Sequence, residues 1–321
     1  MDRWLKAVVV MIGLSLLVAC GSDGDEKADY TIGATQIVEH SSLDAAYVGF
    51  KEALEDAGLK VNYDFQNAQE DMNNVKTISQ NFVSDGVDLI FANSTPSALG
   101  ALNETDEIPI VFTSVTDPVD AGLVSAMDEP GENITGVVDL HPDSITKTVE
   151  FIEEYFSDSV IGLIYNAGEP NSVVQINSVK EAVEGTSLST EERTVASSAE
   201  VQQATVSLVE DVDLLYVVTD NTVVSVLETV VAVANDYEVP LFVGEPDSLA
   251  LGGFMTYGID YHTIGYRTGE IAVEILEEGK SPSEIDVEYP PSLELLINKS
   301  AAESQGIEWN YEWDDLAEII E

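Results

Sequence analysis

Residues 31–66, TIGATQIVEHSSLDAAYVGFKEALEDAGLKVNYDFQ, indicate the fold class of this chain. A short apolar run over 31–35 is followed by a helical pattern over 43–57 that stops at Gly58, and alternating apolar residues then cover 61–66. Glycine directly after a helical segment is a common helix stop. A strand, a helix and a second strand in this order predict a parallel βαβ unit.

The same rhythm continues towards the C-terminus and then repeats. A helical pattern covers 72–83, and strand-like runs cover 89–92 and 108–113. Four phrases recur in the same order at offsets of 125 to 131 residues: Ile32-Gly33 with Ile161-Gly162, 51–54 with 180–183, 88–91 with 213–216, and 108–112 with 239–243. Any two α/β domains share some such phrases, but the common order favours a duplication. We therefore predict an α/β chain with two similar doubly wound parallel-sheet lobes.

The N-terminal side of the quoted stretch has the pattern of an export signal. Arg3 and Lys6 precede an apolar or small run over 7–19, which is shorter than the roughly 20 residues of a membrane-spanning helix. Residues 17–20, Leu-Val-Ala-Cys, resemble the lipobox of bacterial lipoproteins, and Cys20 is the only cysteine. We predict a signal peptide over 1–19, lipidation of Cys20 and a flexible tether over 20–29. An ordinary signal peptide with an unmodified cysteine is the alternative.

The charge balance excludes several classes of partner. The chain has 12 Lys and Arg against 60 Asp and Glu, a formal charge of −48. Nucleic acids and anionic membrane surfaces require basic residues, so membrane attachment is expected through the lipid alone. The carboxylates are spread along the whole chain, which we interpret as adaptation to a saline or alkaline exterior, an acidic outlier from an ordinary habitat being the alternative. One cysteine also excludes a disulfide framework.

Polar residues that follow the predicted strands are the candidate ligand contacts. In open α/β sheets ligands bind beyond the carboxyl ends of the strands, so two facing lobes would enclose one cleft. The candidates are Gln36, His40, Ser94, Thr95, Thr116, Asp117, Asn166, Asn171, Ser172, Asp220, Asn221, Thr222, Glu245 and Asp260. Their hydroxyls and amides suit a carboxylate at helix starts, although plain helix capping explains them equally well. Carboxylates without any Lys or Arg predict a ligand with a cationic group, such as a free amino acid.

Almost the whole mature chain resembles the ABC transporter substrate-binding lipoprotein family that includes tryptophan/tyrosine importers. The phrases that carry this resemblance include NSTPSAL, IPIVFTSVTDPVDAGLV, TDNTVVS, VPLFVGEPD and GGFMTYGIDYHTIGYRTGEIA. The resemblance implies a type I binding-protein fold, an aromatic amino acid as ligand in some members, and an ABC permease and ATPase as partners. It places ligand contacts at Gln36, Ser94, Thr95, Thr116, Asp117, Asn166, Asp220, Asn221, Glu245 and Asp260. Family members often have His-Pro where this chain has His40-Ser41, so that turn is expected to differ.

The resemblance also implies three chain crossings between the lobes, expected near Val138, Gly258 and Ser281. The first lobe would then comprise 30–138 and 259–281, and the second 139–258 and 282–321. Hinge motion about these crossings would close the lobes on the ligand. We expect an exported monomer, anchored by lipid to the outer face of the cell membrane, without cofactor or metal.

Other functions find less support in the sequence. It contains no nucleophile elbow, phosphate-binding loop or dinucleotide fingerprint, and its three histidines are scattered, so we do not expect an enzyme. It has neither a calcium loop nor a histidine cluster for zinc. A regulator with this fold would need a basic DNA-binding domain. A surface sensor, or an importer component for another amino acid or a heterocycle, remains an alternative.

Overall fold

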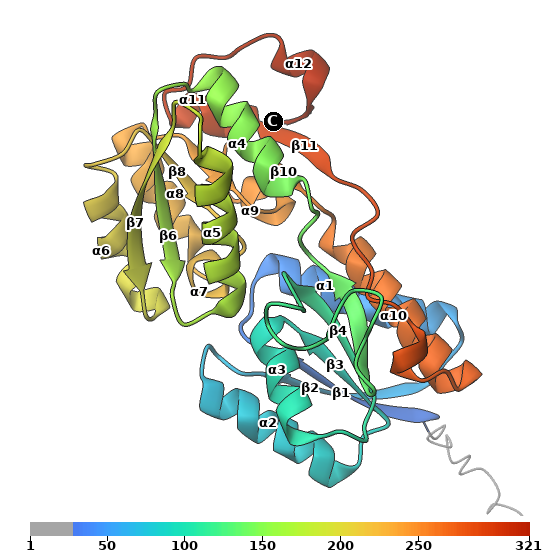
Figure 1. The fold of residues 1–321 in the computed structure, drawn as a ribbon. Coiled ribbons are helices and arrows are strands. Elements are labelled where there is room, and N and C mark those ends of the chain that lie inside the picture. Colours follow the sequence, from blue (N-terminus) through green and yellow to red (C-terminus); the bar gives the residue numbers. More distant parts are fainter. Residues whose placement is uncertain (1–27) are drawn as a thin grey trace, which may run out of the picture.

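The computed structural model describes residues 28–321, which form two α/β lobes, one above the other in Figure 1. The predicted signal peptide, Cys20 and most of the predicted tether lie outside the described residues. Within 28–321 none of the helices combines the length and apolarity that a membrane crossing demands.

The first lobe is built on a parallel five-stranded sheet in the order β2-β1-β3-β4-β5. Its strands are β1 (Tyr30–Gln36), β2 (Val61–Asn67), β3 (Leu89–Asn93), β4 (Ile110–Val115) and β5 (Ile134–Val138). Its helices are α1 (Ser41–Asp56), α2 (Met72–Asp85), α3 (Thr95–Glu104) and α10 (Tyr261–Glu278). Apolar residues of α2 and α3 form the core on one face of the sheet, and those of α1 and α10 form the core on the other. The sheet is therefore covered on both faces, as the apolar strands require.

The second lobe has a seven-stranded sheet in the order β12-β11-β10-β9-β8-β6-β7. Its strands are β6 (Val160–Asn166), β7 (Ser189–Val195), β8 (Leu214–Val217), β9 (Leu241–Val243), β10 (Met255–Gly258), β11 (Glu294–Asn298) and β12 (Glu318–Ile320). Its helices are α4 (Ser144–Tyr155), α5 (Pro170–Val183), α6 (Ser198–Leu208), α7 (Asn221–Val224), α8 (Leu227–Tyr237), α9 (Pro246–Ala250), α11 (Lys299–Ser304) and α12 (Trp313–Leu316). Helices α4 and α5 cover one face, and α6 and α8 cover the other.

The predicted duplication is visible in the strand order. The order β2-β1-β3-β4 of the first sheet corresponds to β7-β6-β8-β9 of the second, with parallel pairing throughout. Among the named strands of residues 28–321, β10 and β11 alone pair antiparallel, because β11 returns from the first lobe in the opposite direction. The expected fold class, two lobes with mainly parallel sheets, is confirmed.

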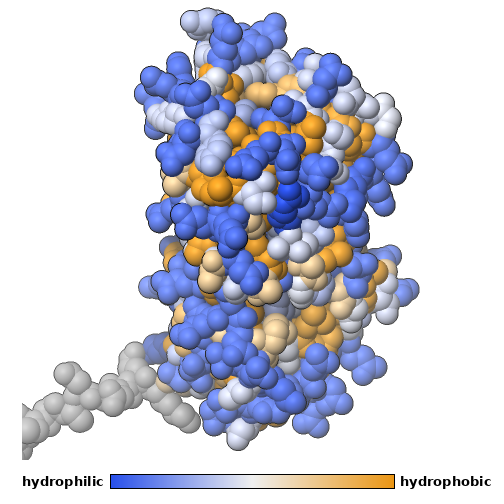
Figure 2. All heavy atoms as spheres, turned by 90° about the vertical axis from the view of Figure 1, so that its left-hand side faces the viewer, coloured by the Kyte–Doolittle hydropathy of each residue, from blue (hydrophilic) through white to orange (hydrophobic). Residues whose placement is uncertain are grey.

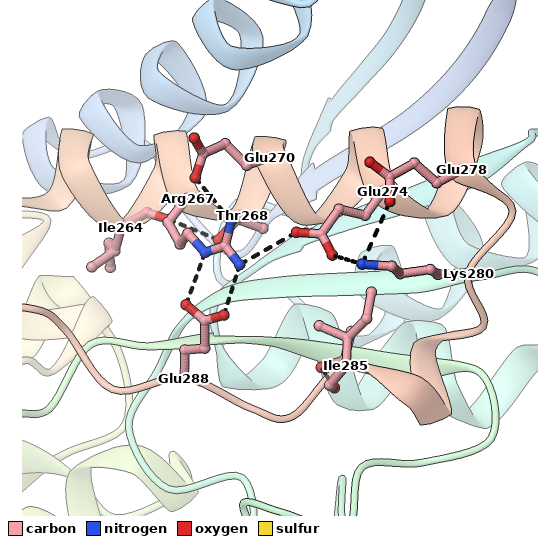
Figure 3. A network of polar contacts seen from close by, with 10 residues as sticks. Ile264, Arg267, Thr268, Glu270, Glu274, Glu278, Lys280, Ile285 and Glu288 are labelled. Carbon is pink, nitrogen blue, oxygen red and sulfur yellow. Dashed lines mark hydrogen bonds and ion pairs between the residues drawn. The ribbon is translucent and has the colours of Figure 1, made fainter.

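Three segments connect the lobes, and the third leaves the first lobe later than expected. The backbone amide of Glu288 donates to Gly136 O at 3.0 Å, and Val138 donates back to Glu288 O at 2.9 Å. Arg267 on α10 also binds the Glu288 carboxylate through two nitrogens, both at 2.8 Å (Figure 3). Because these bonds hold the chain to β5 and α10, the crossing follows Glu288, and its expected position near Ser281 is corrected.

Most of the negative charge lies on the surface. Only Asp139, Glu169, Asp220 and Glu245 are buried among the acidic residues of 28–321. Figure 2 shows one face of the molecule, on which hydrophilic side chains surround smaller apolar patches. Surface carboxylates are hydrated and screened by salt, so they cost the fold far less than the four buried ones.

Candidate ligand-binding site between the lobes

The carboxyl ends of strands from both lobes converge on one narrow cavity. The first lobe contributes the start of α1 and the end of β4, the second lobe contributes the starts of α5, α7 and α9, and the crossings contribute two further side chains. The lining residues are His40, Leu43, Ser114, Asp139, Asn171, Thr219, Asp220, Asn221, Val224, Glu245 and Tyr261. The two sheets thus face each other at the edge where α/β proteins bind ligands.

Three buried carboxylates face this cavity. Asp139 is 8 % exposed, Asp220 0 % and Glu245 2 %. No Lys or Arg lines the cavity, and none within 28–321 is buried, so no basic group of the described residues compensates these carboxylates at the cavity. An ionised carboxylate out of water is costly unless a cation or several hydrogen bonds compensate it. The cavity is therefore suited to a cationic group.

Asp220 is held where β8 passes into α7. Its carboxylate accepts hydrogen bonds from the backbone amides of Val223 at 2.8 Å and Asn166 at 2.7 Å, the first of which caps α7. Burial, and next the charge of Glu169, raise the pKa of Asp220 to about 7. Glu169 itself accepts from the side chains of Thr222 at 2.8 Å and Asn221 at 2.6 Å. Two buried acids therefore share the start of one short helix.

Glu245 and Asp139 approach the cavity from different elements. Glu245 caps α9 through Ser248 and accepts from Ser42 Oγ of the first lobe at 2.8 Å. Asp139, just after β5, accepts from Tyr261 OH at 2.9 Å and Thr116 Oγ1 at 3.2 Å. Burial raises the pKa of Glu245, and burial raises the pKa of Asp139 to about 6.

Two strand ends carry backbone conformations that are unusual for residues other than glycine. Ser94, after β3, has φ 129°, and Ser114, in β4, has φ 56°. Conformations of this kind cost free energy and concentrate at ligand sites, where the surrounding structure holds them. Ser94 caps α3 by accepting from the Ser97 amide at 3.3 Å, and Ser114 donates to Asn93 at 2.7 Å.

The structure separates the predicted site residues into three groups. Five line the cavity, namely His40, Asn171, Asp220, Asn221 and Glu245. Asn166 and Thr222 line an adjoining groove of about 700 Å³ between the lobes. Gln36, Ser94, Thr95, Thr116 and Ser172 are buried but do not line the cavity.

Asp117 and Asp260 form the third group and lie outside the cavity. Asp117 accepts from the backbone amides of Val119 and Asp120, both at 2.9 Å, and so closes a turn. Asp260 is exposed and caps α10 through the amide of Thr263. Both follow strands as expected, but neither side chain lines the cavity, so we remove them from the candidate set.

Sequence reasoning missed several groups at the cavity. Ser114 and Glu169 stand at strand ends, so the same rule could have selected them. Asp139 follows β5, whose end leads into a crossing, and a rule for strand ends applied to β5 would also have found it. Tyr261 gave no signal beyond its aromatic character, because only the packing of α10 brings its hydroxyl to Asp139.

Direct bonds between the lobes hold the cavity closed. Besides Ser42 and Glu245, Glu70 after β2 accepts from Ser225 Oγ at 2.8 Å and Ser198 Oγ at 3.2 Å in the second lobe. Glu70 also lines the adjoining groove, and its φ of 60° places it in the left-handed region. The lobes are therefore in contact on two sides of the cavity.

Comparison with known proteins places these features in context. Residues 31–317 match the family described as ABC transporter substrate binding protein. Over 305 residues the chain is 43 % identical to a Tyrosine-binding protein of Clostridioides difficile (strain R20291), covering 90 % of this chain and 88 % of that protein.

Two solved structures bear on the arrangement of the lobes. An ABC domain in complex with L-Trp from Streptococcus pneumonia has a TM-score of 0.86 at 31 % identity, and a ligand-free, open substrate binding protein from Clostridium difficile has 0.67 at 38 % identity. Each match covers 91 % of this chain and 99 % of the other. Despite its lower identity, the complex superposes better, which agrees with the closed contacts between the lobes.

Proposed function

This chain belongs to the ABC transporter substrate-binding protein family, and from that premise we propose that it binds an aromatic amino acid, tyrosine or tryptophan, between its lobes. The tyrosine-binding relative and the similarity to a complex with L-Trp support this choice of ligand. The protein serves an ABC transporter as the substrate-binding component, with a permease and an ATPase as its partners.

The observation that carries the proposal is the set of buried carboxylates that face one cavity without a basic residue. Asp139, Asp220 and Glu245 would repel an anionic ligand, whereas the ammonium group of an amino acid would compensate their charge. Within 28–321 no three His, Cys, Asp or Glu side chains are placed to hold a metal ion, which favours an organic cation.

The carboxylate of the amino acid also has a suitable environment. The first turn of helix α3 lines the adjoining groove through Pro96, and Thr95 Oγ1 in that turn is buried without a hydrogen-bond partner among residues 28–321. Hydroxyls and free amides at a helix start stabilise a carboxylate. A zwitterion would thus bind with its ammonium among the carboxylates and its carboxylate at the start of α3.

The ammonium requirement can be tested with ligand analogues. We expect micromolar or tighter binding of L-tyrosine or L-tryptophan by isothermal titration calorimetry. N-acetyl-L-tyrosine, which lacks the ammonium group, is expected to bind at least about 100-fold more weakly. Equal binding of the acetylated analogue, or no binding of either amino acid, would refute the proposal.

A substitution tests the same point from the protein side. Asp220→Asn retains a residue that caps helices well but removes the charge. We expect it to weaken the amino acid by about 2 kcal/mol. Asp117→Asn, which alters a strand-end carboxylate outside the cavity, is the matched control and should bind as the parent does. Equal losses of affinity in both variants would contradict the assignment of Asp220 as a partner of the ligand's ammonium group.

Family members that serve importers work outside the cytoplasm, and we propose that this chain is held there by lipid on Cys20. The lipobox at 17–20 and the polar segment that follows support this. We also propose that the protein is a monomer and that its acidic surface is an adaptation to salt or alkali. Cys20→Ser should move the protein from the membrane fraction into the soluble fraction, whereas an unchanged distribution would exclude the anchor.

A further inference from the structure

Two buried polar atoms of the cavity have no hydrogen-bond partner among residues 28–321. They are Asn171 Oδ1 on α5 of the second lobe and His40 Nδ1 at the start of α1 of the first lobe. Both atoms are buried, and both residues line the cavity. Buried polar atoms are nearly always hydrogen-bonded, so two unpaired ones in one cavity point to a ligand group that pairs with them.

The orientation of the Asn171 amide follows from its neighbours. Its nitrogen donates to Thr219 O at 3.1 Å and lies 3.3 Å from a carboxylate oxygen of Glu169. Both neighbours are acceptors, so the nitrogen must face them and the oxygen must be the free end. Asn171 is 4 % exposed and its Oδ1 is buried, so bulk water does not satisfy this oxygen.

The state of the His40 ring follows from Asn221. The amide nitrogen of Asn221 donates to Glu169 at 2.6 Å, which leaves its oxygen to accept a hydrogen bond from the imidazole. Burial lowers the pKa of His40 to about 4, so the ring is neutral at pH 7 and carries one proton. Asn221 is the hydrogen-bond partner of the ring, and Nδ1 has none within 28–321, so we assign the proton to Nε2 and the role of acceptor to Nδ1.

The cavity therefore offers neutral acceptors besides its carboxylates. We propose that Asn171 Oδ1 and His40 Nδ1 form a neutral acceptor pair that receives a hydrogen bond from the ligand's side chain. The inference rests on the proposed function and narrows it: the site selects an aromatic ring that bears a donor, the phenol of tyrosine or the indole of tryptophan, over phenylalanine. With phenylalanine the acceptors would stay buried and unpaired.

The ammonium group is the other donor that could reach the pair. Ionised carboxylates are stronger acceptors than an amide oxygen or a neutral imidazole, so the ammonium belongs with Asp139, Asp220 and Glu245. The two assignments differ in a measurable way. A pair that served the ammonium would affect tyrosine and phenylalanine equally, whereas a pair that serves the side chain affects only tyrosine.

The test compares the dissociation constants of L-tyrosine and L-phenylalanine by calorimetry at pH 8. We expect the parent protein to prefer tyrosine by about tenfold or more, and Asn171→Leu to reduce this preference to within about threefold. Gln175→Leu is the matched control. Gln175 also donates to Thr219 O, at 3.5 Å, and is buried, but it does not line the cavity, so its variant should keep the parental preference.

His40→Leu removes the other acceptor, from the first lobe, and should also reduce the preference for tyrosine. It therefore tests the acceptor pair if Asn171→Leu fails to fold. Equal binding of tyrosine and phenylalanine by the parent overturns the acceptor pair while leaving the proposed function in place. An undiminished preference in the folded variants does the same. Failure of the parent to bind any aromatic amino acid removes the proposed function and the acceptor pair together.

Discussion

Replacing Asp139 with asparagine should make the protein more stable at pH 8 and a weaker binder. Asp139 is buried between β5 and the second lobe, and its carboxylate accepts hydrogen bonds from Tyr261 and Thr116. Asparagine has nearly the same shape and can hydrogen-bond to both hydroxyls, which reorient freely. The substitution therefore removes the charge with little change in packing.

The magnitude follows from the shifted pKa. Burial raises the pKa of Asp139 from 3.8 to about 6, which corresponds to a cost of about 3 kcal/mol in the free energy of unfolding once the group is ionised. The folded carboxyl keeps its proton to higher pH than the unfolded one. The cost is therefore absent below about pH 4 and fully present above about pH 6. Asparagine avoids this cost but forms weaker hydrogen bonds, so we expect a net gain of about 1–2 kcal/mol at pH 8.

Urea unfolding at pH 5 and pH 8 measures this effect. The parent should lose about 1.4 kcal/mol more than Asp139→Asn between these pH values. The measurements are made in 1 M NaCl, which screens the surface carboxylates. Subtracting the free energies of unfolding of the two proteins at each pH removes the titration of the groups that they share. Asp117→Asn, in an outlying turn, is the control. The same variant should bind the amino acid at least about tenfold more weakly. A parental pH dependence in Asp139→Asn, together with lower stability at pH 8, would refute the reasoning.

Three further predictions concern ligand binding and packing. The dissociation constant of the amino acid, measured by calorimetry, should rise as the pH falls from 8 to 5, by up to about tenfold per pH unit for each proton taken up. The reason is that the raised pKa values of Asp139 and Asp220 let these acids take up protons while the ligand's ammonium stays charged. A dissociation constant that does not change with pH would exclude these acids as the ammonium site. Glu70→Ala removes the hydrogen bonds that Ser198 of α6 and Ser225 donate to Glu70 across the cleft. In stopped-flow fluorescence the ligand dissociation rate should rise about five- to tenfold, with little change in the association rate. An unchanged dissociation rate would show that these bonds do not hold the lobes closed. Gly265→Ala would place a methyl group on the carbonyl oxygen of Ala46 and force α1 and α10 apart. It should lower the free energy of unfolding, measured by thermal unfolding, by about 3 kcal/mol or more. A melting temperature equal to that of the parent would contradict this close packing of the two helices.

Local structure was largely predictable from the sequence. The expected helix over 43–57 is α1 over Ser41–Asp56, and the expected strand over 89–92 is β3 over Leu89–Asn93. The strand expected over 108–113 instead runs over Ile110–Val115, and the Pro109 carbonyl accepts from Ile90 at its edge. Proline has no amide hydrogen for the ladder, so regular pairing begins after it. Periodicity and proline act over a few residues, which is why such patterns predict elements well.

The candidate site was predictable only in part. Residues after strands were expected to face one cleft, and Asp220, Glu245 and Asn171 do so. Asp117 and Asp260 follow the same rule and, like Asp220 and Glu245, accept from nearby backbone amides, yet they do not line the cavity. Which strand ends face the opposite lobe depends on how the two lobes pack, and this cannot be read from the type of residue.

Three properties follow from the amino-acid sequence alone: the two-lobed parallel architecture, the surplus of carboxylates and the edge of each sheet at which polar residues gather. They depend on composition and on periods of a few residues. Which carboxylates are buried and where the lobes connect depends on the tertiary structure. Asp139 lies at the cavity because Tyr261, 122 residues later in the chain, donates to it, and the third crossing begins where Arg267 holds Glu288. Contacts between distant segments set burial, and burial sets the charge that a ligand meets.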